Sequence, residues 1–148
     1  MTLLLVLLLN GCASKGPINS PNFDNRFTEI ISSAENILLY SPTQVRVGTY
    51  MEAEIKMIPS YNGVMVLTNH AIRFLHWDAE EKNYRIQVYL PYTDLKQAKY
   101  EFNTLISSFV AVRATNGEAF AFMLSDEMIK LTYRFLMMGQ AGHLNAQK

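Results

Sequence analysis

Residues 63–74 read GVMVLTNHAIRF and contain two short apolar runs separated by Asn69 and His70. Runs of β-branched, aliphatic and aromatic residues on either side of a polar pair are typical of two strands joined by a turn. The Asn62-Gly63 pair just before them is a strong hairpin signal, so residues 59–63 are expected to form a turn. The stretch therefore predicts a turn, a strand over 64–68, a second turn and a strand over 71–77.

Further strands are predicted on both sides of this stretch. Apolar and polar residues alternate over residues 44–57, as in a long half-buried strand. Asn116-Gly117 indicates a two-residue hairpin turn. The other predicted strands cover residues 84–90, 95–102, 106–114 and 118–124, which brings the predicted number of strands to seven.

An amphipathic helix is predicted over residues 23–40. Apolar residues recur there at spacings of three and four, starting at Phe23, with charged and polar residues between them. Ser41-Pro42 is expected to end this helix. We expect it to pack on the folded domain.

A second helix is predicted near the end of the chain. Ser125 is a credible N-cap, the helix should run to about Met138, and Gly139 and Gly142 are expected to end it. Because this helix is apolar nearly all round, its outer side needs a cover. The amphipathic helix at 23–40 is the expected cover, and a partner protein is the alternative.

The order of elements predicts a mainly β chain of the α+β class, either a small seven-stranded barrel or orthogonal sheets closed by the C-terminal helix. Residues 63–74 resemble the strand-turn-strand of GRAM and bacterial PH-like domains, where a glycine opens a strand that ends in Leu-Thr-Asx. Residues 91–95 (PYTDL) and 115–122 (TNGEAFAF) are similar to later segments of the same family. The resemblance implies a PH-like domain over residues 44–138 and a flexible tail over 139–148.

The family's best-known activity, phosphoinositide binding, uses several Lys and Arg residues in and after the first hairpin. This sequence has Lys56 and Arg73 but no basic cluster between Met57 and Thr68. The head-group site is therefore not carried over to this chain.

The N-terminal residues resemble a bacterial lipoprotein signal peptide. Residues 3–9 form an apolar run that is shorter than the roughly 20 residues of a transmembrane helix. Residues 9–12 read LNGC, which resembles a lipobox. The resemblance implies cleavage after residue 11, lipidation of Cys12 and a tether over residues 12–22. With Ala13 and Ser14 after the cysteine and no aspartate there, it implies the outer membrane, facing the periplasm.

Charge and motif content exclude several classes of function. The chain carries 13 basic and 13 acidic residues, so it has no basic surplus for nucleic acid. No signature of a metalloprotease, nucleotide-binding loop or paired-cysteine metal site is present. We expect His70, His76 and His143 to be structural, and we expect no catalytic residue, metal or cofactor.

The sequence thus predicts a non-catalytic, membrane-anchored binding or scaffold module that acts through protein contacts. A carrier of a small apolar ligand or lipid is the alternative, and it requires an interior cavity with a mouth. A hydrolase is a third possibility and requires His70 or His76 beside a serine or carboxylate in a cleft. The predicted partner-binding residues lie on the C-terminal helix and are Met128, Leu131, Phe135 and Met138.

Overall fold

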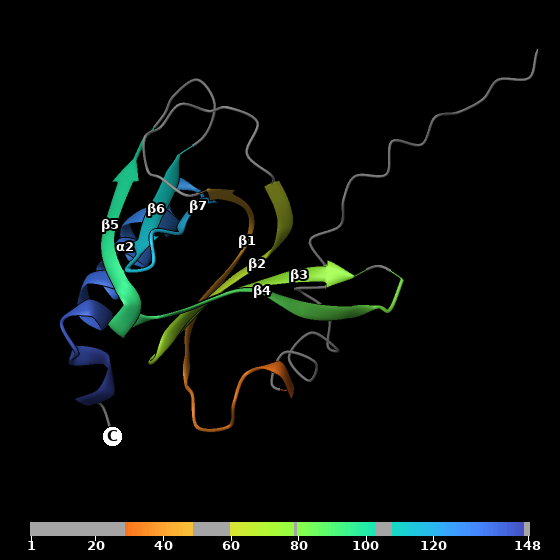
Figure 1. Ribbon diagram of the computed structural model, residues 1–148, viewed down its shortest axis with the longest axis horizontal. Helices are drawn as coiled ribbons and strands as arrows, with labels where there is room; N and C mark the ends of the chain where they lie inside the picture. Colours follow the sequence, from red (N-terminus) through yellow and green to blue (C-terminus); the bar gives the residue numbers. More distant parts are fainter. Residues whose placement is uncertain (1–28, 49–59, 79, 103–107, 147–148) are drawn as a thin grey trace, which may run out of the picture.

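The computed structural model describes residues 29–48, 60–78, 80–102 and 108–146. They form a seven-stranded antiparallel sheet in the order β4-β3-β2-β1-β7-β6-β5, with a helix, α2, packed against it. Figure 1 shows this arrangement. The strands are β1 (Ile37–Gly48), β2 (Ser60–Thr68), β3 (Ala71–Asp78), β4 (Asn83–Pro91), β5 (Leu95–Glu101), β6 (Phe109–Ala114) and β7 (Ala119–Met123). The helices are the 3₁₀ turn η1 (Tyr92–Asp94), α2 (Asp126–Gln140) and the 3₁₀ turn η2 (His143–Ala146).

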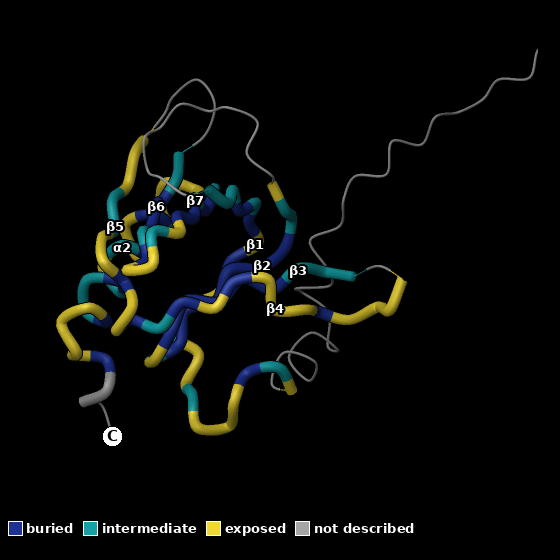
Figure 2. The backbone as a smooth tube through the Cα atoms, viewed as in Figure 1, coloured by how far each residue is buried: buried dark blue, intermediate teal, exposed yellow. Residues whose placement is uncertain are grey.

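The long strand β1 joins the two halves of the sheet. Its first part, from Ile37 to Arg46, pairs with β2, and its last part, from Gln44 to Gly48, pairs with β7. Figure 1 shows β1 curving between the β2–β4 half and the β5–β7 half, with α2 beside β5 and β6. The main core lies between these elements, and Figure 2 shows β2 as largely buried and β4 and β5 as largely exposed along their length.

The predicted turn over residues 59–63 is wrong, because Ser60 to Gly63 lie inside β2. Gly63 is paired with Thr43 of β1 and with His76 of β3. A Cβ atom at position 63 would lie 2.1 Å from the carbonyl oxygen of Leu75, so the glycine permits close approach of a neighbouring strand. The connection between β1 and β2 lies outside the described residues, as does the rest of the predicted strand over 44–57.

The predicted helix over 23–40 is wrong at its C-terminal end. Residues 37–40 belong to β1, and among the described residues of that range only Glu29 and Ile30 are helical. Pairing of Ile37 with Thr68 and of Tyr40 with Val66 outweighs the helical spacing, because local propensity is weaker than tertiary pairing. Residues 23–28 lie outside the described residues.

Ser41-Pro42 does not end a helix, because both residues lie within β1. Pro42 is paired with Val64 of β2 but precedes Gln44, where pairing with β7 begins. On that side β1 behaves locally as an edge strand, which is where a sheet tolerates proline.

The expected packing of the N-terminal segment on the C-terminal helix is also wrong for the residues described. Ile31 is buried with residues of β2 and β3 in a cluster separate from the main core, whereas Ile129 and Leu136 of α2 belong to the main core. In Figure 1 the orange segment before β1 runs below β3 and β4, and α2 lies beside β5 and β6.

The strand predicted over 64–68 is confirmed, but β2 begins four residues earlier. The strands predicted over 71–77, 84–90, 95–102 and 118–124 are confirmed to within one residue at each end. The strand predicted over 106–114 is confirmed from Phe109 on, and residues 106 and 107 lie outside the described residues. The turn at Asn116-Gly117 is also confirmed, with three loop residues rather than two. Gly117 has a φ of +92° and donates its N–H to the Ala114 carbonyl, while Ala114 donates to the Glu118 carbonyl. This is a turn followed by a glycine in the left-handed region, the common three-residue hairpin.

The predicted C-terminal helix is confirmed, and Ser125 is its N-cap, accepting a hydrogen bond from the Met128 N–H. Gly139 does not end the helix: it is buried inside α2, where an added Cβ would lie 2.6 Å from the Tyr92 ring. Gly142, with a φ of +76°, follows the end. The predicted tail boundary at 139 is therefore wrong, and Leu144 is buried in the main core.

Within the described part of the chain, no helix has the length and apolar character needed to cross a membrane.

Candidate binding surfaces

The face of α2 turned toward the core carries Ile129, Thr132, Leu136 and Gly139, all buried. Of the four predicted partner-binding residues, Met128, Phe135 and Met138 are half-buried against the main core, and Leu131 is 39% exposed. The predicted set therefore does not form one exposed face. Three of the four residues lie at the edge of the main core, and only Leu131 is exposed. The main core therefore contacts a wider part of the α2 surface than the single stripe of buried residues.

An exposed aromatic surface lies where β5 meets α2. Tyr100 is 44% exposed and Phe102 is 45% exposed. The Tyr100 ring makes edge contacts with Phe102 at 5.4 Å and with Tyr133 of α2 at 4.8 Å between centroids. Lys130 Nζ lies 6.0 Å from the centroid of the Phe102 ring. We refer to Tyr100, Phe102, Lys130 and Tyr133 as the β5–α2 aromatic surface.

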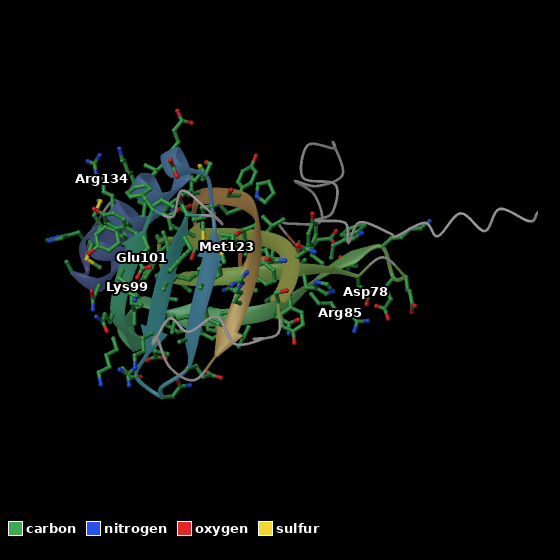
Figure 3. The ribbon with its side chains drawn as sticks, turned by 90° about the horizontal axis from the view of Figure 1, so that it is seen from above. Asp78, Arg85, Lys99, Glu101, Met123 and Arg134 are labelled. Carbon is green, nitrogen blue, oxygen red and sulfur yellow. The ribbon has the colours of Figure 1, made fainter. Side chains whose placement is uncertain are left out.

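The strand that carries this surface stands at one end of the sheet. Among the described residues β5 pairs only with β6. The Gln140 side chain donates from Nε2 to the carbonyl of Leu95 at 3.1 Å, which covers the start of the free edge. Lys99 pairs with Glu101 at 3.1 Å, and Figure 3 shows both residues on the same side of the molecule as Arg134. The surface thus combines exposed rings, cations and a strand edge.

A second polar cluster lies on the outer side of β2 and β3. Arg73 of β3 forms an ion pair with Glu35, and both side chains are 9% exposed. The hydroxyl of Thr68 donates to the other carboxylate oxygen of Glu35 at 2.7 Å. The Arg73 guanidinium lies over the Tyr89 ring, 4.4 Å from its centroid.

Tyr92 supports this cluster from below. Its hydroxyl donates to the Thr68 carbonyl at 2.9 Å. Burial, helped by the nearby negative charge of Glu35, raises the pKa of Tyr92 above its usual range, so the phenol stays neutral. This neutral donor holds the end of β2, where Thr68 presents its hydroxyl to Glu35.

Of the three histidines, only His76 makes a side-chain hydrogen bond within the described residues. His76 Nδ1 is hydrogen-bonded to the Asn62 carbonyl at 2.9 Å, while His70 and His143 are exposed. Asp78 accepts the N–H groups of Glu81 and Glu80, and these bonds, with Arg85, hold the pKa of its carboxyl below the usual value. Asp78 therefore caps the β3–β4 turn. The described residues contain no group of three or more His, Cys, Asp or Glu side chains able to hold a metal ion.

Cys12, the predicted lipidation site, lies outside the described residues, and its lipidation stays a prediction.

No protein-family model matches the sequence, and no curated protein matches it. Similar folds occur among solved structures. A structure of Vav1 inhibited by an allosteric inhibitor has a TM-score of 0.54 at 8% identity, and a structure concerning the PH and C1 domains of the Vav1 exchange factor has 0.53 at 7%. Each match covers 72% of this chain, but only 27% and 26% of the respective Vav1 chains.

The chain has a PH-like α+β fold. The C-terminal domain of an unknown protein from Leishmania infantum is also similar, with a TM-score of 0.52 at 12% identity, and the match covers 80% of this chain and 94% of that one. At these identities the likeness concerns the fold alone. The fold class predicted from the order of strands and helix is confirmed.

Within this PH-like domain, Arg73 is not placed to bind a lipid head group. Its side chain is almost fully buried and already paired with Glu35. Lys56, the other basic residue considered for such a site, lies outside the described residues. The positions of the described residues thus give no support to a phosphoinositide site at Arg73.

The β5–α2 aromatic surface and the Glu35–Arg73 pair were not predicted. Tyr100 could be recognised only as one of several strand aromatics, and Tyr133 only as part of an apolar helix. Their contact joins two elements distant in the sequence, and Glu35 and Arg73 are 38 positions apart. No local sequence pattern predicts the Tyr100–Tyr133 contact or the Glu35–Arg73 ion pair.

Proposed function

We propose that this chain is a membrane-anchored lipoprotein whose PH-like domain acts as a non-catalytic binding module for a protein partner. The anchor would be lipid on Cys12, within the LNGC motif, and the domain would face the periplasm from the outer membrane. Several acyl chains on one residue give lasting attachment, since each buried methylene contributes about 0.8 kcal/mol.

The observation that carries the binding role is the β5–α2 aromatic surface. Tyr100 and Phe102 are nearly half exposed, and the Tyr100 ring makes edge contacts with the rings of Phe102 and of the half-buried Tyr133. Aromatic residues dominate the energetics of protein interfaces, and rings already held in place lose little conformational entropy on binding. Leu131, 39% exposed on the same helix, adds apolar area to α2.

The interior of the domain favours surface binding over a carrier role. The space between the two halves of the sheet holds Phe74, Phe122 and Ile129, each at most 1% exposed and all in one packed cluster. A carrier would need this space for its ligand. The described interior thus supports binding at the exterior.

The proposal is tested by isolating membranes from cells that make the full chain and cross-linking them chemically. Tyr100→Ser with Phe102→Ser removes the exposed rings. Tyr40→Ser with Ile86→Ser is the matched control, because these residues are 44% and 45% exposed and lie on β1 and β4. We expect the cross-linked partner band to disappear with the first pair and to persist with the control pair. Equal loss or equal retention would contradict the proposed surface.

The anchor is tested separately with Cys12→Ala. We expect the unsubstituted chain in the membrane fraction and the variant in the soluble periplasmic or unprocessed fraction. Unchanged membrane attachment of a processed variant would contradict lipidation of Cys12 without bearing on the aromatic surface.

A further inference from the structure

The outer side of β2 and β3 carries a cluster of apolar side chains next to the Glu35–Arg73 pair, although it faces away from the main core. Val64, Val66 and Leu75 are each 0% exposed and form a second cluster with Tyr84. An antiparallel sheet commonly leaves one face to water, and that face is then polar. Here the second face is built to be covered.

The segment just before β1 covers part of this face. Ile31 is 4% exposed and belongs to the second cluster, and Ile30 packs beside it. The segment is fastened at its end by two reciprocal bonds. Asn36 donates its N–H to the Asn69 side chain at 2.8 Å, and the Asn69 N–H donates to the Asn36 carbonyl at 3.0 Å.

Between the buried Ile31 and the hydrogen-bonded Asn36, the segment places the carboxylate of Glu35 against the sheet. The Glu35 side chain meets the Arg73 guanidinium with one oxygen and the Thr68 hydroxyl with the other. The Tyr89 ring lies over the guanidinium, and Arg73 Nε, though buried, has no hydrogen-bond partner among the described residues. The sheet thus presents an apolar floor for an aliphatic side chain and a buried cation with a hydroxyl donor for a carboxylate.

These contacts are specific for a carboxylate but contribute little net binding free energy. Removing the carboxylate would leave the buried Arg73 charge uncompensated, which disfavours a neutral replacement. The intact pair adds little net stability, because desolvation of both charges offsets most of their attraction. A ligand held in this way is specific, and it can be exchanged.

We propose that the outer face of β2 and β3 is a peptide-binding site, filled in cis by residues 31–36 and able to take a partner segment of the same chemistry. That chemistry is an aliphatic residue followed four positions later by a glutamate, with a turn between them that is closed here by a hydrogen bond from the Glu35 N–H to the Ser32 carbonyl. The cis segment competes through its high effective concentration, on the order of millimolar for a short connection. The site depends neither on the lipid anchor nor on the β5–α2 aromatic surface.

The test uses the full-length Cys12→Ala chain in mild detergent and a fluorescent peptide of residues 29–36, EIISSAEN. Fluorescence anisotropy measures its binding to the chain and to a Glu35→Gln variant, in which the cis segment lacks its carboxylate. Glu81→Gln is the matched control, because Glu81 is an exposed glutamate that pairs with Arg85. We expect the Glu35→Gln chain to bind the peptide at least tenfold more tightly than the Cys12→Ala chain and the Glu81→Gln control.

A peptide carrying the Glu35→Gln change is expected to lose that gain. Equal affinity of the two peptides, equal affinity of all three chains, or no binding at millimolar peptide would each overturn the proposal.

A second measurement avoids the risk that Glu35→Gln destabilises the chain. Hydrogen exchange of the Asn36 amide, which is bonded to Asn69, is followed in the chain with native Glu35 at increasing peptide concentration. Displacement of the cis segment predicts exchange at least fivefold faster at saturating peptide. An unchanged rate at millimolar peptide would contradict exchange at this site.

Discussion

Replacing Gly63 with alanine is expected to disrupt the pairing of β2 with β3. The added Cβ would lie 2.1 Å from the Leu75 carbonyl oxygen and 2.8 Å from Phe74 Cζ. The first contact is with backbone, so no side-chain rotation relieves it. Non-bonded heavy atoms rest about 3.5 Å apart, so the added Cβ and the Leu75 oxygen must move apart by about 1.4 Å.

The magnitude follows from what this separation strains. Overpacking a buried site costs about 1–3 kcal/mol, and each backbone hydrogen bond that is weakened to the point of loss costs about 1 kcal/mol. Two bonds near the Gly63–His76 and Val64–Leu75 pairs are at risk. We therefore expect Gly63→Ala to lower the free energy of unfolding by about 3–5 kcal/mol, against a total of about 5–15 kcal/mol for a typical domain.

Gly117→Ala is the matched control, because it changes the other Asn-Gly pair. No described heavy atom lies within 4 Å of a Cβ at position 117, and the cost is the left-handed φ of +92° alone. That strain is worth about 1–2 kcal/mol. Urea unfolding of the full-length Cys12→Ala chain, followed by circular dichroism, measures both losses. A loss for Gly63→Ala no larger than that for Gly117→Ala would refute the close approach of β2 and β3 at residue 63.

Three further predictions concern the polar groups of the fold. Glu35→Gln should lower the free energy of unfolding by about 3–5 kcal/mol, because it leaves the buried Arg73 charge uncompensated. The double variant Glu35→Met with Arg73→Met should recover most of that loss in urea unfolding. A double variant no more stable than Glu35→Gln would be inconsistent with an uncompensated charge at Arg73. Burial raises the pKa of Tyr84 to about 12 from 10.0. The neutral phenol therefore contributes fully to the free energy of unfolding below pH 10, and this contribution is lost as the pH rises toward 12. Tyr84→Phe should make the free energy of unfolding less dependent on pH in that window, and an unchanged pH dependence would argue against burial as the cause. Ser125→Ala should cost about 1 kcal/mol through loss of the N-cap of α2, and a thermal melt identical to that of the unsubstituted chain would show that the cap contributes nothing.

The two Asn-Gly pairs explain what local sequence can and cannot predict. Both carry the same hairpin signal, and it is right at Asn116-Gly117, where Gly117 adopts a positive φ. At Asn62-Gly63 the glycine is needed because Leu75 and Phe74 approach it from the next strand. The two pairs differ in which residues of other strands lie next to the glycine. A single sequence does not show which residues these are.

The same limit applies to the candidate surfaces. The strands and α2 follow from periodicity and capping, because those signals are local. Residues 37–40 form a strand because β2 pairs with them, against a helical spacing that looked favourable. Glu35 meets Arg73 because the segment before β1 lies against β3, and Tyr100 meets Tyr133 because α2 packs against β5.

Site-specific photo-crosslinking tests the proposed binding role most directly. A photoreactive phenylalanine analogue replaces Phe102 in the full, membrane-attached chain, and the same analogue at Ile86 is the control, since both residues are 45% exposed. A partner at the β5–α2 aromatic surface predicts a discrete protein adduct from position 102 and none from position 86. Adducts of equal yield from both positions, or from neither, would contradict it.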